Sequence, residues 1–196
     1  MKSWSIKILL LVLVFQSLKG YTQNRKLEKD SIVLATISSD FFRWYISASS
    51  NHSNGECFPV FVQDKNGMTT LDYSKYIKNL KDLSFSDSLI AKEKSSYQVC
   101  IDNLAKVKYS DFLKFEDLDD FESRNCDFTN YYHWTGGQEM YEVYTVTRVK
   151  INKKDAAVIG FLFNPSGGRG IKGERREIST TFVKQNNQWK VSGIKY

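Results

Sequence analysis

The spacing of apolar residues changes once along this 196-residue chain, near Gln138, and that change restricts the folds it can adopt. Before Gln138 the apolar residues recur three or four positions apart, as on one face of a helix. After Gln138 they alternate, as on a strand with one buried face. Helices first and strands afterwards predict the α+β class, with N-terminal helices packed on a curved four-stranded antiparallel sheet.

The first expected helix covers about Leu27–Ala48 and has a markedly aromatic face. At helical spacing such a face indicates core rather than a ligand platform. The aromatic residues are Phe41, Phe42, Trp44 and Tyr45.

Further helical patterns follow a loop at residues 51–67 that contains a short extended piece, Phe58–Val62. One pattern runs from Leu71 to Leu80 and another from Asp87 to Val107, with Ser86 or Asp87 as its N-cap. A helical turn at Ser110–Phe115 then leads into an acidic stretch, Glu116–Glu122.

Four strands are expected after Gln138. In the first, one face carries Tyr141, Val143, Thr145, Thr147 and Val149, and the other carries Met140, Tyr144 and Val146. The second, Ala156–Phe163, is apolar on both faces and should be central. A glycine-rich loop at 164–173 separates it from strands at 177–184 and 188–195.

The first 22 residues have the features of a cleavable secretory signal. Lys2 and Lys7 precede an apolar run, Ile8–Phe15, and the small residues Gly20 and Thr22 precede a cut before Gln23. We therefore expect an exported chain, periplasmic or extracellular, whose residues 23–196 form a single domain. No cysteine stands directly after the apolar run, as a bacterial lipoprotein anchor would need, so a stable membrane anchor is not expected.

The leader also accounts for half of the formal charge of +6. It contains three lysines and no acidic residue, so 25 basic and 22 acidic residues remain, a net charge of +3. That balance gives no reason to expect nucleic acid as a partner.

Three cysteines, Cys57, Cys100 and Cys126, remain in the mature chain. Their spacing matches neither a zinc ribbon nor a thioredoxin-type redox pair. One disulfide with one buried thiol, or three reduced buried cysteines, are comparable hypotheses.

Three segments carry a resemblance to a known group of proteins. Phe41–Ile46, Ser110–Asp117 and Asn187–Val191 resemble exported bacterial domains of unknown function in the nuclear transport factor 2-like superfamily. The resemblance covers most of the mature chain and implies a cone, in which a bent sheet wraps helices and leaves a pocket at the open end. It implies no catalytic residues, and the fold serves both enzymes and binding modules.

The best candidate for a ligand pocket surrounds His133. Aromatic residues at the mouth of a cone would bind an apolar ligand, and a histidine there could move protons. The competing interpretation places these aromatic residues in the core. The candidate residues are Tyr131, Tyr132, His133, Trp134 and Tyr144.

Other motifs point to no chemistry. The loop Pro165–Gly173 has glycines and cations but is expected between two strands, without the helix N-terminus that a phosphate loop needs. The carboxylates from Asp117 to Asp127 do not match a calcium loop. Catalytic residues, cofactors and metal ions are therefore not predicted.

We accordingly expect an exported, non-enzymatic domain that binds a protein or a small apolar ligand, with dimerisation through the sheet face as a possibility. An isomerase or hydrolase that uses His133 and a pocket carboxylate is one alternative. An immunity-type protein that neutralises a toxin in the periplasm is the other.

Overall fold

The computed structural model describes residues 2–51, 55–126, 133–137, 140–167 and 171–196, with the backbone alone for residues 2–24. It confirms the α+β class: helices occupy the N-terminal two thirds and a four-stranded antiparallel sheet the C-terminal third. A small two-stranded sheet, β1 (Val60–Gln63) and β2 (Thr69–Asp72), was not predicted as such.

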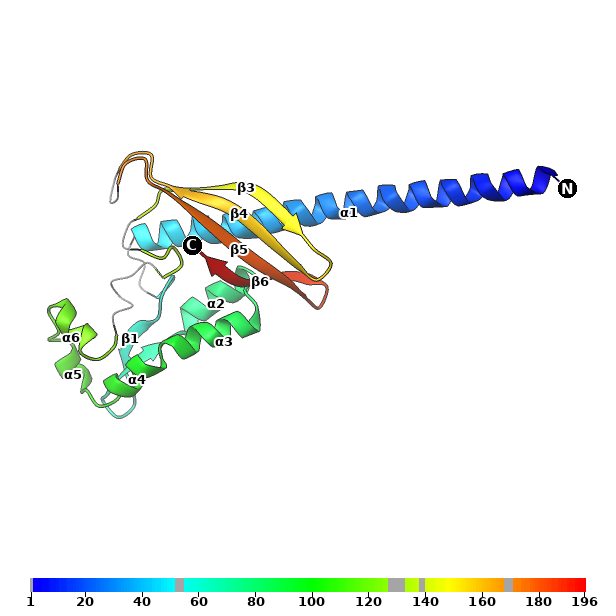
Figure 1. Ribbon diagram of the computed structural model, residues 1–196. Coiled ribbons are helices and arrows are strands. Elements are labelled where there is room, and N and C mark those ends of the chain that lie inside the picture. The colour runs from blue at the N-terminus through cyan, green and yellow to red at the C-terminus, as the bar shows by residue number, and fades with distance from the viewer. Residues whose placement is uncertain (1, 52–54, 127–132, 138–139, 168–170) are drawn as a thin grey trace.

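Helix α1 (Lys2–Ser50) is much longer than the predicted Leu27–Ala48. Its C-terminal part packs on the sheet, whereas its N-terminal part projects beyond the domain (Figure 1). The buried residues of the C-terminal part recur at helical spacing, which confirms the predicted aromatic core face; they are Leu34, Ser38, Phe41, Phe42, Tyr45 and Ala48.

The main sheet has the strand order β3-β4-β5-β6, each strand antiparallel to the next. The strands are β3 (Val143–Ile151), β4 (Asp155–Phe163), β5 (Arg175–Gln185) and β6 (Gln188–Lys195). Strand β4 is central, as its two-sided apolar pattern predicted. Consecutive strands are joined by hairpin connections, so the glycine-rich segment before β5 lies between two strands, as expected.

A β-bulge in β3 changes the predicted faces of that strand. Val146 pairs with Gly160 and Arg148 with Ile159, so Thr147 is an extra residue. Since side chains alternate with period two, the extra residue turns Val149 toward the core although Val143 points outward. The expected shared face of Val143 and Val149 is therefore wrong.

Gly160 makes room for the Tyr144 ring in the middle of the sheet. A Cβ on Gly160 would lie 2.6 Å from that ring, which is closer than atoms can approach. The Tyr144 hydroxyl lies 2.8 Å from Ser38 Oγ, and Ser38 Oγ lies 3.1 Å from Thr180 Oγ1. This group of three hydroxyls joins α1 to β3 and β5 within an otherwise apolar interface.

Helices α2 (Ser74–Asp82), α3 (Asp87–Ser96) and α4 (Gln98–Leu104) follow the small sheet. Ser86 caps α3, because its Oγ accepts a hydrogen bond from the Leu89 N–H at 3.2 Å. Backbone hydrogen bonds from Ser86 N to Val191 O and from Val191 N to Ser84 O attach the α2–α3 turn to β6.

The predicted single helix from Asp87 to Val107 is wrong, because the helix is interrupted at Tyr97. The carbonyl that would accept from the Tyr97 N–H belongs to Glu93, and it accepts instead from Ser96 Oγ at 2.6 Å. Tyr97 N–H bonds Lys94 O, three residues back. Serine hydroxyls that compete for helix carbonyls thus divide the segment.

A smaller group of elements lies away from the main sheet, around β1, β2 and the helices α5 (Tyr109–Phe112) and α6 (Leu118–Glu122) (Figure 1). Leu71, expected in a helix, lies in β2. The acidic stretch contains α6, and Asp117 caps it by accepting from the Asp120 N–H at 3.2 Å. A disulfide between Cys100 and Cys126 joins α4 to the end of this segment.

Candidate functional site

A pocket of about 550 Å³ opens between α3 and β6. Helix α3 contributes Leu89, Lys92 and Glu93 to its wall, and β6 contributes Ile194 and Lys195. His133 lines the same pocket, so the predicted candidate histidine and a buried carboxylate share one wall.

Glu93 is the centre of the hydrogen bonding at this wall. Its side chain is only 3% exposed, yet it has three partners. Oε1 accepts from the Tyr76 hydroxyl at 2.7 Å and from the Tyr97 hydroxyl at 2.8 Å. Oε2 lies 2.8 Å from Nε2 of His133. A buried carboxylate is tolerated because these groups replace its hydration.

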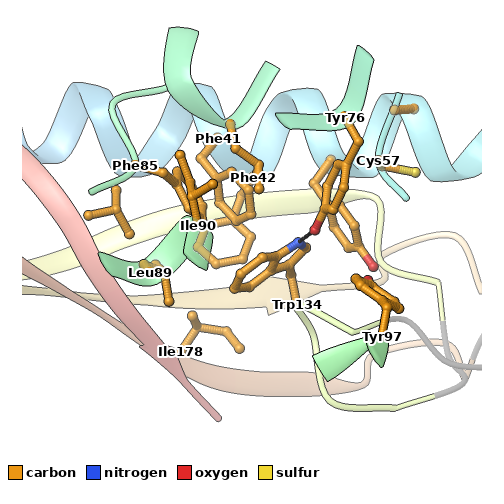
Figure 2. Close-up of a cluster of buried hydrophobic side chains, with 14 of the residues drawn as sticks. Phe41, Phe42, Cys57, Tyr76, Phe85, Leu89, Ile90, Tyr97, Trp134 and Ile178 are labelled. Atoms are coloured by element: carbon orange, nitrogen blue, oxygen red, sulfur yellow. Dashed lines mark hydrogen bonds between the residues drawn. The ribbon is translucent and has the colours of Figure 1, made fainter. Parts of the chain in front are cut away.

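The network continues into the aromatic core. Trp134 donates from Nε1 to the Tyr76 hydroxyl at 3.0 Å, so Tyr76 receives one hydrogen bond and donates the next. Figure 2 shows the Trp134 indole pointing at the Tyr76 hydroxyl, with Phe41 and Phe85 beside it. The chain from Trp134 through Tyr76 to Glu93 fixes the carboxylate within a rigid apolar setting.

The electrostatics of the wall favour an ionised Glu93. Burial opposes ionisation, but the hydrogen bond and charge of His133, together with the two tyrosine hydroxyls, bring the pKa of Glu93 below its usual value. The pKa values of Tyr76 and Tyr97 lie well above the ordinary tyrosine value. Burial is the main cause, and the charge of Glu93 is the second. Both tyrosines therefore remain protonated donors.

An ionised Glu93 determines which nitrogen of His133 carries the proton. A carboxylate only accepts hydrogen bonds, so Nε2 must donate. In the neutral ring Nδ1 is then the basic nitrogen, and it has no protein partner within the described residues. The His133 side chain is 41% exposed, so solvent or a ligand can reach it.

The rest of the pocket combines apolar wall with positive charge. Leu89 and Ile194 provide apolar surface, and Lys92 and Lys195 are exposed cations. The lining thus suits a ligand with an apolar body and one anionic group.

The hydroxyls of three lining serines are directed to other protein atoms. Ser96 Oγ donates to the Glu93 carbonyl, Ser88 Oγ lies 3.2 Å from Ser86 Oγ, and Ser192 Oγ donates to Thr181. Within the described residues none of them bonds His133, so the wall does not form a serine–histidine nucleophile.

The structure brings together only part of the predicted site. His133 lines the pocket, and Trp134 lies beside it with its ring buried. Tyr144 lies elsewhere, since it packs on Phe42 at 4.4 Å and bonds Ser38, and it is not part of this pocket wall. The candidates Tyr131 and Tyr132 lie outside the described residues.

Sequence reasoning missed Glu93, although a signal was present. Leu89, Ile90, Glu93 and Tyr97 follow helical spacing, which places a carboxylate on the apolar face of α3. A charged residue at a core position is rarely left without partners. That position should have indicated a buried polar network.

Across the described ranges, no three histidine, cysteine or acidic side chains gather as metal ligands would. Among the residues described with their side chains, which begin at residue 25, no helix combines the length and apolar character that crossing a membrane requires.

No protein family and no curated protein sequence matches this chain. Fold and site therefore define the class by themselves: an α+β domain with a hydrogen-bonded histidine–glutamate pair in the wall of a partly apolar pocket.

Proposed function

We propose that this protein is an exported binding domain whose pocket between α3 and β6 takes a small ligand with an apolar body and one anionic group. The observation that carries the proposal is the position of His133 in the pocket wall, with Nε2 held by buried Glu93 and Nδ1 left for a ligand. Lys92 and Lys195 supply the charge that an anionic group would meet.

Export has separate support. The first 22 residues match a secretory signal, and an intrachain disulfide is typical of oxidising compartments. The cone of the nuclear transport factor 2-like superfamily is also part of the proposal. It is supported by the packing of α1 on the sheet and by the sequence resemblance described above.

Binding can be tested with 8-anilinonaphthalene-1-sulfonate, an apolar fluorescent probe with one anionic group. We expect saturable binding to the folded protein and competition by octanoate. Lys92→Gln/Lys195→Gln should weaken probe binding about fivefold, because each exposed cation contributes at most about 1 kcal/mol. The matched control, Lys81→Gln/Lys153→Gln, removes two exposed lysines away from the pocket.

Equal affinity of wild type, pocket variant and control would contradict the proposal. Probe binding only under unfolding conditions would contradict it as well. His133→Ala provides a further comparison, since it removes the ring from the pocket wall without altering the lysines.

A proton-transfer enzyme is the second candidate, and the His133–Glu93 pair favours it. A carboxylate that fixes a histidine tautomer is the arrangement that general-base catalysis uses. Hydrolysis of two esters, p-nitrophenyl acetate and p-nitrophenyl octanoate, tests this function. An enzyme should hydrolyse them faster than the uncatalysed background, and His133→Ala should lower that rate about 100-fold or more. A rate equal in wild type and variant would exclude His133 as the base for these esters.

A further inference from the structure

A second hollow, of about 680 Å³, lies between the segment after α4 and the turn after α6. Three cations line it, Lys106, Lys108 and Arg124, together with a single carboxylate, Asp111. It shares no lining residue with the His133 pocket. Nothing in the proposed function accounts for it.

The one carboxylate is already paired with a lysine. Asp111 forms an ion pair with Lys114 at 2.8 Å, and the hydrogen bond and charge of Lys114, with a contribution from Lys108, lower the Asp111 pKa. The carboxylates of α6 do not line this hollow. The remaining charge facing it is therefore positive.

Arg124 is held in place from several sides. Its guanidinium lies over the Phe115 ring, 5.1 Å from the centroid. Its carbonyl accepts a hydrogen bond from Asn103 Nδ2 at 2.8 Å, and two residues later Cys126 is bonded to Cys100. A guanidinium stacked on a ring keeps its N–H donors in one plane at the edge, the geometry that binds oxyanions.

The donors of Arg124 are not used by the described part of the protein. Its Nε is buried and has no hydrogen-bond partner there, and no carboxylate pairs with the guanidinium. An oxyanion in the hollow would supply an acceptor for guanidinium N–H donors that the described residues do not use.

The two lysines also stand on a fixed backbone. Val107 O, between them, accepts from the Thr69 N–H at 2.9 Å, and the Tyr109 N–H bonds Gly67 O at 2.9 Å. Both bonds attach the segment to the β1–β2 hairpin, and Met68 and Lys108 form an isolated β-bridge. The backbone that carries the two lysines is thus fixed before any ligand arrives.

We propose that this hollow is an oxyanion-binding site that takes a phosphate, sulfate or carboxylate group, with Arg124 as the main ligand-binding residue and Lys106 and Lys108 as supporting cations. The proposal is independent of the ligand proposed for the His133 pocket.

Calorimetric titration of the full chain with inorganic phosphate, sulfate and acetate at constant ionic strength tests the site. At least one anion should bind saturably. Arg124→Gln should weaken that binding about tenfold or more, because it removes a charge-assisted hydrogen-bonding fork. Lys106→Gln/Lys108→Gln should weaken it by a smaller factor, and Lys81→Gln/Lys153→Gln should leave it unchanged. Tighter binding of phosphate or sulfate than of acetate would show that the site prefers a tetrahedral anion. Tighter binding of acetate would show that it prefers a carboxylate.

Arg124→Lys keeps the charge but loses the planar fork, so it should retain the fold and bind more weakly than wild type. If Arg124→Gln does not fold, the Arg124→Lys variant provides the test instead. Saturable binding that is equal in wild type, Arg124→Lys and the double-lysine variant would overturn the proposal, as would the absence of saturable binding of all three anions.

Discussion

Nε2 of His133 lies 2.8 Å from Oε2 of Glu93, a carboxylate that is almost completely buried. The pair joins the exposed wall of a pocket to the aromatic core, because Glu93 also accepts from Tyr76 and Tyr97. One side chain therefore has two roles: it orients the histidine, and it connects α2, α3 and the segment before β3.

Removal of Glu93 should destabilise the protein. Glu93→Ala leaves two buried tyrosine hydroxyls and His133 without their acceptor, so we expect a loss of about 3 kcal/mol or more in the free energy of unfolding. Urea unfolding followed by tryptophan fluorescence measures it. Glu122→Ala, on exposed α6, should change stability by less than about 0.5 kcal/mol. A similar small effect for both variants would contradict the structural role of Glu93.

Lowering the pH should remove the contribution of Glu93 to the free energy of unfolding. Its pKa is lowered in the folded protein, so the stabilisation is fully present above the unfolded value of about 4.3 and is lost as pH falls through the folded value. The difference in unfolding free energy between wild type and Glu93→Gln should thus shrink as pH is lowered from about 5 to 2.5. A difference that stays constant over this range, or grows toward acid, would show that the folded pKa is not lowered.

The aromatic face of α1 should dominate the core. Phe41 is fully buried and its ring contacts the rings of Phe85 and Trp134. Phe41→Ala should cost about 3–5 kcal/mol, through lost burial and the cavity left behind. Arg43 is a close control on the same helix, with a side chain 76% exposed. The free energy of unfolding of Arg43→Ala should lie within about 0.5 kcal/mol of the wild-type value. Equal losses of stability in Phe41→Ala and Arg43→Ala, measured by urea unfolding, would be inconsistent with this packing.

The cysteines should differ in reactivity. Cys100 and Cys126 are bonded to each other, and burial raises the pKa of the free Cys57 thiol to about 11. Without reductant, a thiol reagent should react slowly with the native protein and modify one thiol per chain in denaturant. Three reactive thiols in denaturant would contradict the disulfide. Cys100→Ser/Cys126→Ser should lower the free energy of unfolding by about 2–4 kcal/mol.

Periodicity was sufficient to predict the fold class, the core face of α1 and the four strands, because each of these depends on which side chains must be buried. It failed where single polar contacts decide the backbone path. The hydroxyl of Ser96 interrupts the helix at Tyr97. One inserted residue, Thr147, turns the side chains after it in β3 to the opposite face of the sheet. Such contacts leave no periodic signal.

The candidate site was predictable only in part for a related reason. His133 was predictable because a titratable residue among aromatic ones stands out in the sequence. Its partner Glu93 is 40 positions away on a helix, and nothing in either local sequence pairs the two. Tyr144 belongs to a different polar group because β3 packs on α1, where the Tyr144 hydroxyl meets Ser38.

The central claim is that Glu93 holds Nε2 of His133 and leaves Nδ1 to a ligand. Long-range proton–nitrogen NMR of the histidine rings tests it directly, and the chain contains only two histidines, so His133→Ala assigns the signals. At pH 8 the His133 ring should be protonated at Nε2, the nitrogen that Glu93 accepts from, and unprotonated at Nδ1. A neutral His133 ring with its proton on Nδ1 and none on Nε2 would contradict the claim.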